Sequence, residues 1–169
     1  RRLLVTLYTE TKPKNGKSGK NLALPENSQD VTPISRAGQL GNMNAGNDGN
    51  KQDSESSFNG ELKTEDFWGY TWPQTYKMNK LVYTTGDVIE GLGGWFEDLK
   101  VQVRQNFEWK DISGLSVEPV YLSNSEVGSN TEYVFSFADT WGDGIRIIGK
   151  PGGKSAFTSM SELEVYFSE

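Results

Sequence analysis

The chain has 169 residues, a formal net charge of −6, and neither cysteine nor histidine. This length fits one domain with a sizeable core, and the acidic charge argues against nucleic acid as a partner. Disulfides, imidazole metal sites and histidine-dependent catalysis are excluded, and no apolar run is long enough to predict a membrane span.

The first part of the chain predicts little regular structure. Residues 3–8 form either a strand or the end of a preceding linker, and residues 11–20, rich in Lys, Gly, Asn and Ser, are typical of a flexible connection. We therefore interpret 1–20 as a linker or an extra N-terminal strand and 21–169 as the folded module. Because the chain begins with Arg1 and shows no signal peptide, we expect it to be an excised module of a larger protein.

A polar loop follows over about 36–64. A loop of that length inside a domain is usually functional, disordered or fixed by something such as a metal ion.

From residue 66 onward, short alternating runs predict strands separated by turns. No segment has the apolar spacing of a helix, so the predicted fold class is all-β, an antiparallel β-sandwich. Strands are predicted over 66–72 (ended by Pro73), 76–83, 99–103, 111–115, 133–137, 145–148 and 161–167. Turns are predicted at 106–109, 139–144 and 149–153.

Several short phrases occur in a characteristic order: Asn21-Leu-Ala-Leu24, Asn47-Asp-Gly49, Phe67-Trp-Gly-Tyr-Thr-Trp-Pro73, 76–83, Gly93-Gly-Trp-Phe96 with 99–105, Ile145-Arg-Ile-Ile-Gly149 and Glu162-Leu-Glu-Val-Tyr166. Together they resemble the coagulation factor V/VIII C-type (discoidin-like) domains, the group that contains carbohydrate-binding module family 32. The resemblance implies a jelly-roll sandwich, galactose-binding-domain-like, that binds sugars or surfaces and does not catalyse.

The acidic loop 48–54 is a candidate calcium site. Calcium prefers six to eight oxygen ligands from carboxylates and carbonyls, and Gly49 lets the backbone curl around an ion. The resemblance implies a structural calcium with four ligands in this chain: the carboxylates of Asp48 and Asp53, the carbonyl of Asn50, and Glu162 of the closing strand. The turn at 59–64 is an alternative ligand loop, and a simple tight turn at 47–49 is the alternative to any metal.

The aromatic residues divide into two groups. Trp68, Tyr70 and Trp72 share one strand face, as do Tyr133, Phe135 and Phe137, and such stripes predict core.

Trp95 and Trp141 instead lie in turn-rich loops, where recognition surfaces are found. We expect them to stack on sugars, unless they fold back as lids on the core. Asp143 and Arg146 are the expected hydrogen-bonding neighbours, although an internal ion pair is an equal alternative for Arg146.

Acidic pairs such as Asp139 and Asp143 are expected by chance among 23 acidic residues, and no catalytic motif is present. We therefore predict an accessory module, not an enzyme. We expect it to be secreted by a bacterium, extracellular and monomeric, and to bind a polysaccharide or glycan beside neighbouring domains of a glycan-active enzyme. The alternative is a structural or adhesive spacer without sugar affinity.

Overall fold

The computed structural model describes residues 19–36 and 43–169. The strand predicted at 3–8 and most of the predicted linker lie outside these residues. Helical structure in the described part is limited to two 3-10 turns, η1 (Ala45–Asn47) and η2 (Ser125–Val127), and none of its helices has the length and apolarity needed to cross a membrane. The strands are β1 (Thr32–Ser35), β2 (Glu55–Ser56), β3 (Asp66–Thr84), β4 (Lys100–Gln105), β5 (Glu108–Asp111), β6 (Ser116–Glu118), β7 (Glu132–Gly149), β8 (Ser159–Met160) and β9 (Glu162–Tyr166).

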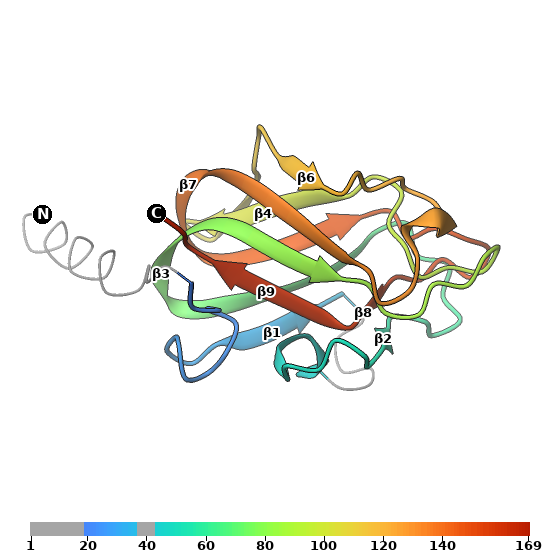
Figure 1. Ribbon diagram of the computed structural model, residues 1–169, viewed down its shortest axis with the longest axis horizontal. Helices are drawn as coiled ribbons and strands as arrows, with labels where there is room; N and C mark the ends of the chain where they lie inside the picture. Colours follow the sequence, from blue (N-terminus) through green and yellow to red (C-terminus); the bar gives the residue numbers. More distant parts are fainter. Residues whose placement is uncertain (1–18, 37–42) are drawn as a thin grey trace, which may run out of the picture.

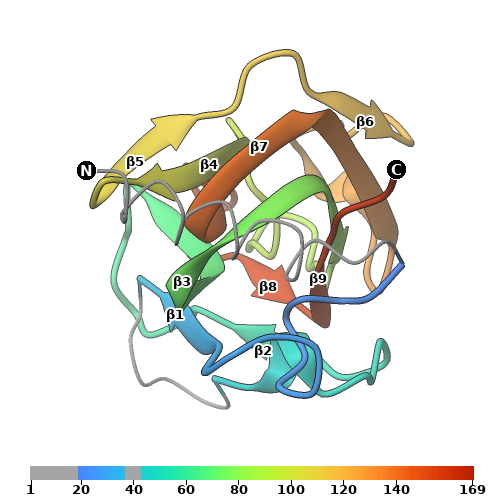
Figure 2. The same cartoon turned by 90° about the vertical axis from the view of Figure 1, so that its left-hand side faces the viewer.

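Two long strands, β3 and β7, pair antiparallel along their length and bend together, so that each contributes to both layers of the sandwich (Figure 1). The first half of β3 and the second half of β7 form one layer with β1, β4 and β5. The other halves form the second layer with β6 and β9. Figure 2 looks onto the end where both strands bend. The predicted antiparallel β-sandwich is confirmed.

The strands predicted on either side of Pro73 are one continuous strand, so the predicted end at this proline is wrong. Thr71 pairs with Gly144 while Tyr76 pairs with Gly142, so β3 carries extra residues between them and bulges. Pro73 lies inside this bulge, where no ladder bond requires the N–H that proline lacks.

The turn predicted at 139–144 is also wrong, because these residues continue β7. Their glycines serve close packing. A Cβ on Gly142 would lie 2.3 Å from Val103 Cγ2 and 2.7 Å from the Arg104 carbonyl oxygen, and a Cβ on Gly144 would lie 3.0 Å from the Trp109 ring. Glycine is therefore required here because β4 and β5 approach closely.

Replacing Gly142 with alanine should lower the free energy of unfolding by about 1–3 kcal/mol, the usual cost of overpacking. Chemical denaturation measures the change. Ser136→Ala, at an exposed position of the same strand, is the matched control and should stay within about 0.5 kcal/mol of wild type. A tolerated Gly142→Ala would contradict the close approach of β4.

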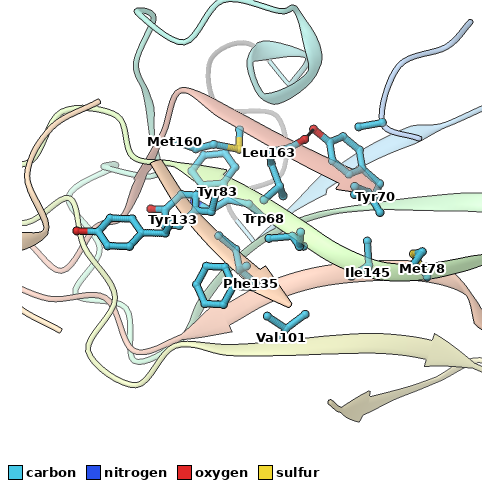
Figure 3. Close-up of a cluster of buried hydrophobic side chains, with 14 of the residues drawn as sticks. Trp68, Tyr70, Met78, Tyr83, Val101, Tyr133, Phe135, Ile145, Met160 and Leu163 are labelled. Carbon is cyan, nitrogen blue, oxygen red and sulfur yellow. Dashed lines mark hydrogen bonds between the residues drawn. The ribbon is translucent and has the colours of Figure 1, made fainter. Parts of the chain in front are cut away.

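The core is aromatic and lies between the two layers (Figure 3). Both predicted aromatic stripes are buried, which confirms their assignment to the core: Trp68, Tyr70, Trp72, Tyr133, Phe135 and Phe137. The buried hydroxyls find backbone acceptors: Tyr70 Oη donates to the Leu163 carbonyl (2.8 Å) and Tyr83 Oη to the Ser159 carbonyl (2.6 Å). Burial of these rings therefore leaves no phenol unsatisfied.

The segment at Asn21 closes the sandwich against the last strand. Leu22 N donates to the Val165 carbonyl (2.7 Å), and Val165 N donates to Asn21 Oδ1 (3.0 Å). The beginning of the described chain therefore lies beside β9.

Candidate functional site

Three loops form a groove of about 370 Å³ at the end of the sandwich where β3 ends and β7 begins. Its walls come from segments 54–58, 87–92 and 155–157, on the right-hand side of Figure 1. We call it the loop-end groove. Apart from Ser54, the last residue of the predicted calcium loop 48–54, no residue of these segments was predicted to belong to a site.

The loop-end groove gathers exposed apolar side chains. Phe58 is 54% exposed, Ile89 47% and Leu92 43%. The Phe58 ring rests on the edge of Phe157, with ring centroids 5.7 Å apart, which fixes its orientation. Apolar side chains gathered on a protein surface mark a binding surface, and a positioned ring can stack on the C–H face of a sugar.

Hydrogen bonds between the loops hold the groove in shape. Asp87 N donates to Ser54 Oγ (2.7 Å), Ser155 N to the Leu92 carbonyl (2.9 Å), and Gly94 N to the Phe157 carbonyl (2.8 Å). The walls are therefore organised before any ligand arrives, which lowers the entropic cost of binding.

A buried network of hydrogen bonds, centred on Asp66, lies on the core side of the loop-end groove. The carboxylate of Asp66, fully buried, accepts hydrogen bonds from Ser57 Oγ and from Thr158 Oγ1 (2.6 Å), and Thr158 Oγ1 accepts from Trp68 Nε1 (2.9 Å). Ser57 and Thr158 are the chain neighbours of Phe58 and Phe157. The network therefore fixes the two residues that carry the aromatic pair.

The polar lining of the loop-end groove is acidic. Glu55 and Asp87 line it together with three serines, and its lining includes no basic side chain. Such a groove offers acceptors to hydroxyl or ammonium groups and repels anions.

Two of the predicted calcium ligands meet near this end of the sandwich. Glu162 Oε2 accepts a hydrogen bond from Gly49 N (3.1 Å), which brings the Asp48 loop to the last strand. Glu162 Oε1 is buried and has no hydrogen-bond partner among the described residues. Burial, together with the nearby carboxylates of Asp48 and Glu164, raises the pKa of Glu162 to about 8, although the hydrogen bond from Gly49 N lowers it. A buried carboxylate oxygen without a partner, beside the exposed carboxylate of Asp48, fits a bound cation.

The other two predicted ligands are engaged with different partners. Asn50 Oδ1 accepts from Gln52 N (2.9 Å), and the Asp53 backbone carbonyl accepts from Ser161 Oγ. The side chains of both Asn50 and Asp53 are exposed. Within the described ranges, no group of three or more acidic side chains is arranged to hold a metal, so backbone carbonyls would have to complete a site at Asp48 and Glu162.

The alternative loop at 59–64 does not suit a cation. Asn59 Oδ1 accepts from the ammonium of Lys63 (2.9 Å), and Glu61 is paired with Arg36 (2.7 Å). Positive side chains already occupy the acceptors that a metal would need.

Trp95 is buried and therefore cannot offer the exposed ring that we predicted. It is 6% exposed and belongs to the core. Gly152 covers it so closely that a Cβ there would lie 2.0 Å from Trp95 Nε1. Of the two alternatives, the lid on the core is the one observed.

Trp141 and Asp143, by contrast, line a common groove of about 490 Å³ at the bent end of the sandwich. Trp141 is half-buried, and Asp143 Oδ1 accepts from Arg104 Nε (2.8 Å). Gln105, at the end of β4, and Phe107, in the β4–β5 turn, also line this groove, which we call the turn-end groove.

Arg146 lies elsewhere. Its guanidinium is stacked between Phe67 (4.6 Å) and Trp109 (4.3 Å), and its Nε donates to Gln102 Oε1 (2.9 Å). It is not among the residues that line the turn-end groove, so we assign it to packing on the outer face of the sheet.

Acidic residues considered as catalytic pairs are engaged in surface ion pairs. Asp139 pairs with Lys77 (3.3 Å) and Asp143 with Arg104 (2.8 Å). These contacts have structural explanations and need no catalytic role.

Sequence reasoning missed Phe58 and Phe107. Phe58 is a single aromatic residue in a polar stretch, whereas Phe107 lies in the predicted turn at 106–109, two residues before Trp109. Isolation is the signal that could have identified Phe58, because no core-facing stripe claims such a ring.

Comparison with known proteins places the fold. The sequence matches no family profile, and no curated protein is detectably similar to it.

Solved structures do match. The family 32 module of Clostridium perfringens NanJ, in complex with galactose, has a TM-score of 0.60 and 17% identity over 80% of this chain and 92% of that chain. A second C. perfringens module, GH89 CBM32-5 with GalNAc-β-1,3-galactose, has a TM-score of 0.59 and 16% identity, covering 80% and 94%. Chitosan-binding module 1 from the chitosanase/glucanase of Paenibacillus sp. IK-5 has a TM-score of 0.62 and 15% identity, covering 87% and 98%. The chain thus has the discoidin-like β-sandwich fold of family 32 carbohydrate-binding modules.

Proposed function

We propose that this discoidin-like β-sandwich is a non-catalytic carbohydrate-binding module whose glycan lies in the loop-end groove. The observation that carries the proposal is the exposed ring of Phe58, held by Phe157 beside serine and carboxylate groups. The shared fold supports it, since the similar modules are described as bound to galactose or as chitosan-binding.

The charge of the groove defines the ligand class. Glu55 and Asp87 would accept hydrogen bonds from sugar hydroxyls or pair with an ammonium group, and they would repel carboxylates. We therefore propose neutral or amino sugars as ligands, in preference to uronic or sialic acids.

We also propose that calcium binds between Asp48 and Glu162. The loop that carries Asp48 continues through Asp53 into Ser54, one wall of the groove. Calcium bound there would stabilise the groove as well as the fold.

In its biological setting, we propose an extracellular module that tethers a glycan-active enzyme to its polysaccharide. Tethering raises the local substrate concentration without new catalytic groups.

Replacing Phe58 with alanine should weaken glycan binding by about 1–3 kcal/mol, the range for a stacking anchor, and leave the melting temperature nearly unchanged because the ring is exposed. Titration calorimetry with galactose-, glucose- and xylose-based oligosaccharides and chitosan oligosaccharide measures it, with polygalacturonate as the acidic comparison. Leu62→Ala, 72% exposed but outside the groove, is the matched control. If the wild type binds none of these sugars, the spacer function replaces this proposal.

A further inference from the structure

The turn-end groove contains a residue in an unfavourable backbone conformation. The two-residue turn between β4 and β5 places Asn106 at φ 53° and Phe107 at φ 64°. Asparagine tolerates this region, whereas a bulky side chain does so only at a cost in free energy, and glycine is usual at the second position. Phe107 is also 88% exposed, so no packing against the core compensates for its conformation. Strain and apolar exposure at one residue mark a functional surface.

The polar groups of the turn-end groove are fixed by partners. Arg104 and Asp143 form an ion pair of 2.8 Å, with each side chain about a quarter exposed (25% and 24%). The Gln105 amide donates to the Trp141 carbonyl (2.7 Å), which holds the turn against β7. A fixed donor next to a fixed acceptor matches the neighbouring hydroxyls of a sugar ring, and the rings of Phe107 and Trp141 supply apolar surface.

The charge of this groove differs from that of the loop-end groove. Arg104 and Asp143 are the charged side chains in its lining, so their charges cancel and favour a neutral ligand.

The two grooves lie at opposite ends of the sandwich. Arg104 and Gly144 pair near the bend of β3 and β7, whereas the loop-end groove follows the pair of Thr84 with Glu132 at the other end of these strands. In Figure 1 the bends lie on the left and the loops on the right. A ligand in one groove therefore leaves the other open.

We propose that the turn-end groove is a second saccharide site, for a neutral sugar, and that the module can hold two glycan segments at once. This site stands on its own contacts, although its ligand class extends the proposed function.

Tryptophan fluorescence separates the two sites, because Trp141 lines the turn-end groove and no tryptophan lines the loop-end groove. Neutral gluco-, galacto- and xylo-oligosaccharides should change the emission of the wild type, and Trp141→Phe should remove most of that change. Phe107→Ala should weaken the affinity measured by fluorescence about tenfold or more. It should not change the Phe58-dependent binding that calorimetry measures.

Phe107→Gly provides a further readout. Glycine relieves the backbone strain, so this variant should melt at a higher temperature than wild type while losing the same binding. A residue with only a structural role would not combine these two effects.

The outcomes are distinct. Unchanged emission with every neutral oligosaccharide overturns the second site, whether or not calorimetry still detects the Phe58-dependent one. An emission change that persists at full affinity in Phe107→Ala also overturns it. If calorimetry detects no Phe58-dependent binding while the Trp141-dependent emission change is present, the loop-end site is rejected and the turn-end site is retained.

Discussion

Replacing Asp66 with alanine should lower the free energy of unfolding by about 3–5 kcal/mol, the cost of removing one partner from a buried charged network. The change would leave the hydroxyls of Ser57 and Thr158 without their carboxylate acceptor. It would also remove the negative charge that offsets burial at Lys63, whose pKa burial lowers and Asp66 raises. Denaturant unfolding measures the loss.

Two variants test the origin of this effect. Asp66→Asn keeps an acceptor oxygen without the charge, and we expect an intermediate loss of stability. Asp111→Ala removes an exposed carboxylate whose contact with Lys100 is 3.6 Å long, and no measurable loss is expected. If Asp66→Ala unfolds like wild type, the network contributes little.

Asp66 should also matter for binding, since its partners adjoin Phe58 and Phe157. We therefore expect Asp66→Asn to weaken glycan affinity at a temperature where it remains folded.

Calcium should raise the melting temperature by an amount on the order of 10 °C at a thousandfold excess over its Kd, and the gain should grow with pH. Without metal, the raised pKa of Glu162, about 8, means that the folded protein holds this proton more tightly than the unfolded chain. The associated stability is complete below the ordinary pKa of 4.5 and is lost as the pH rises toward 8. A bound cation favours the ionised carboxylate and removes this loss.

Melting curves with chelator and with calcium, between pH 4 and pH 9, test this prediction. Glu162→Gln should abolish both the calcium effect and the pH dependence, whereas Glu126→Gln, at an exposed position, should preserve both. Identical melting temperatures with chelator and with excess calcium at pH 8 would reject the metal site.

The strand faces were predictable from the sequence because alternation depends on neighbouring residues. Trp68, Tyr70 and Trp72 have period two, and all three are buried. The role of a glycine is different. Gly142 resembles a turn residue in the sequence, yet it is present because Val103, almost forty residues earlier, packs against it.

The site was harder to predict for the same reason. Phe58 and Asp87 are separated widely in the chain and meet only through hydrogen bonds between loops. Trp95 is flanked by the glycines of a loop, and its burial depends on Gly152. Trp141 and Asp143 line one groove, but they lie on strand β7 and not in the predicted turn.

The pairing of β3 has a consequence for the order of folding. Its main partners, β7 and β9, begin at Glu132 and Glu162, so β3 is synthesised long before the strands that cover it. Until then Trp68, Tyr70 and Trp72 have no opposite layer. Such long-range pairing is expected to fold in milliseconds to seconds, and only after the last strand has left the ribosome. A nascent chain would therefore expose its aromatic stripe until β7 and β9 have been synthesised, a form that a holdase chaperone can recognise.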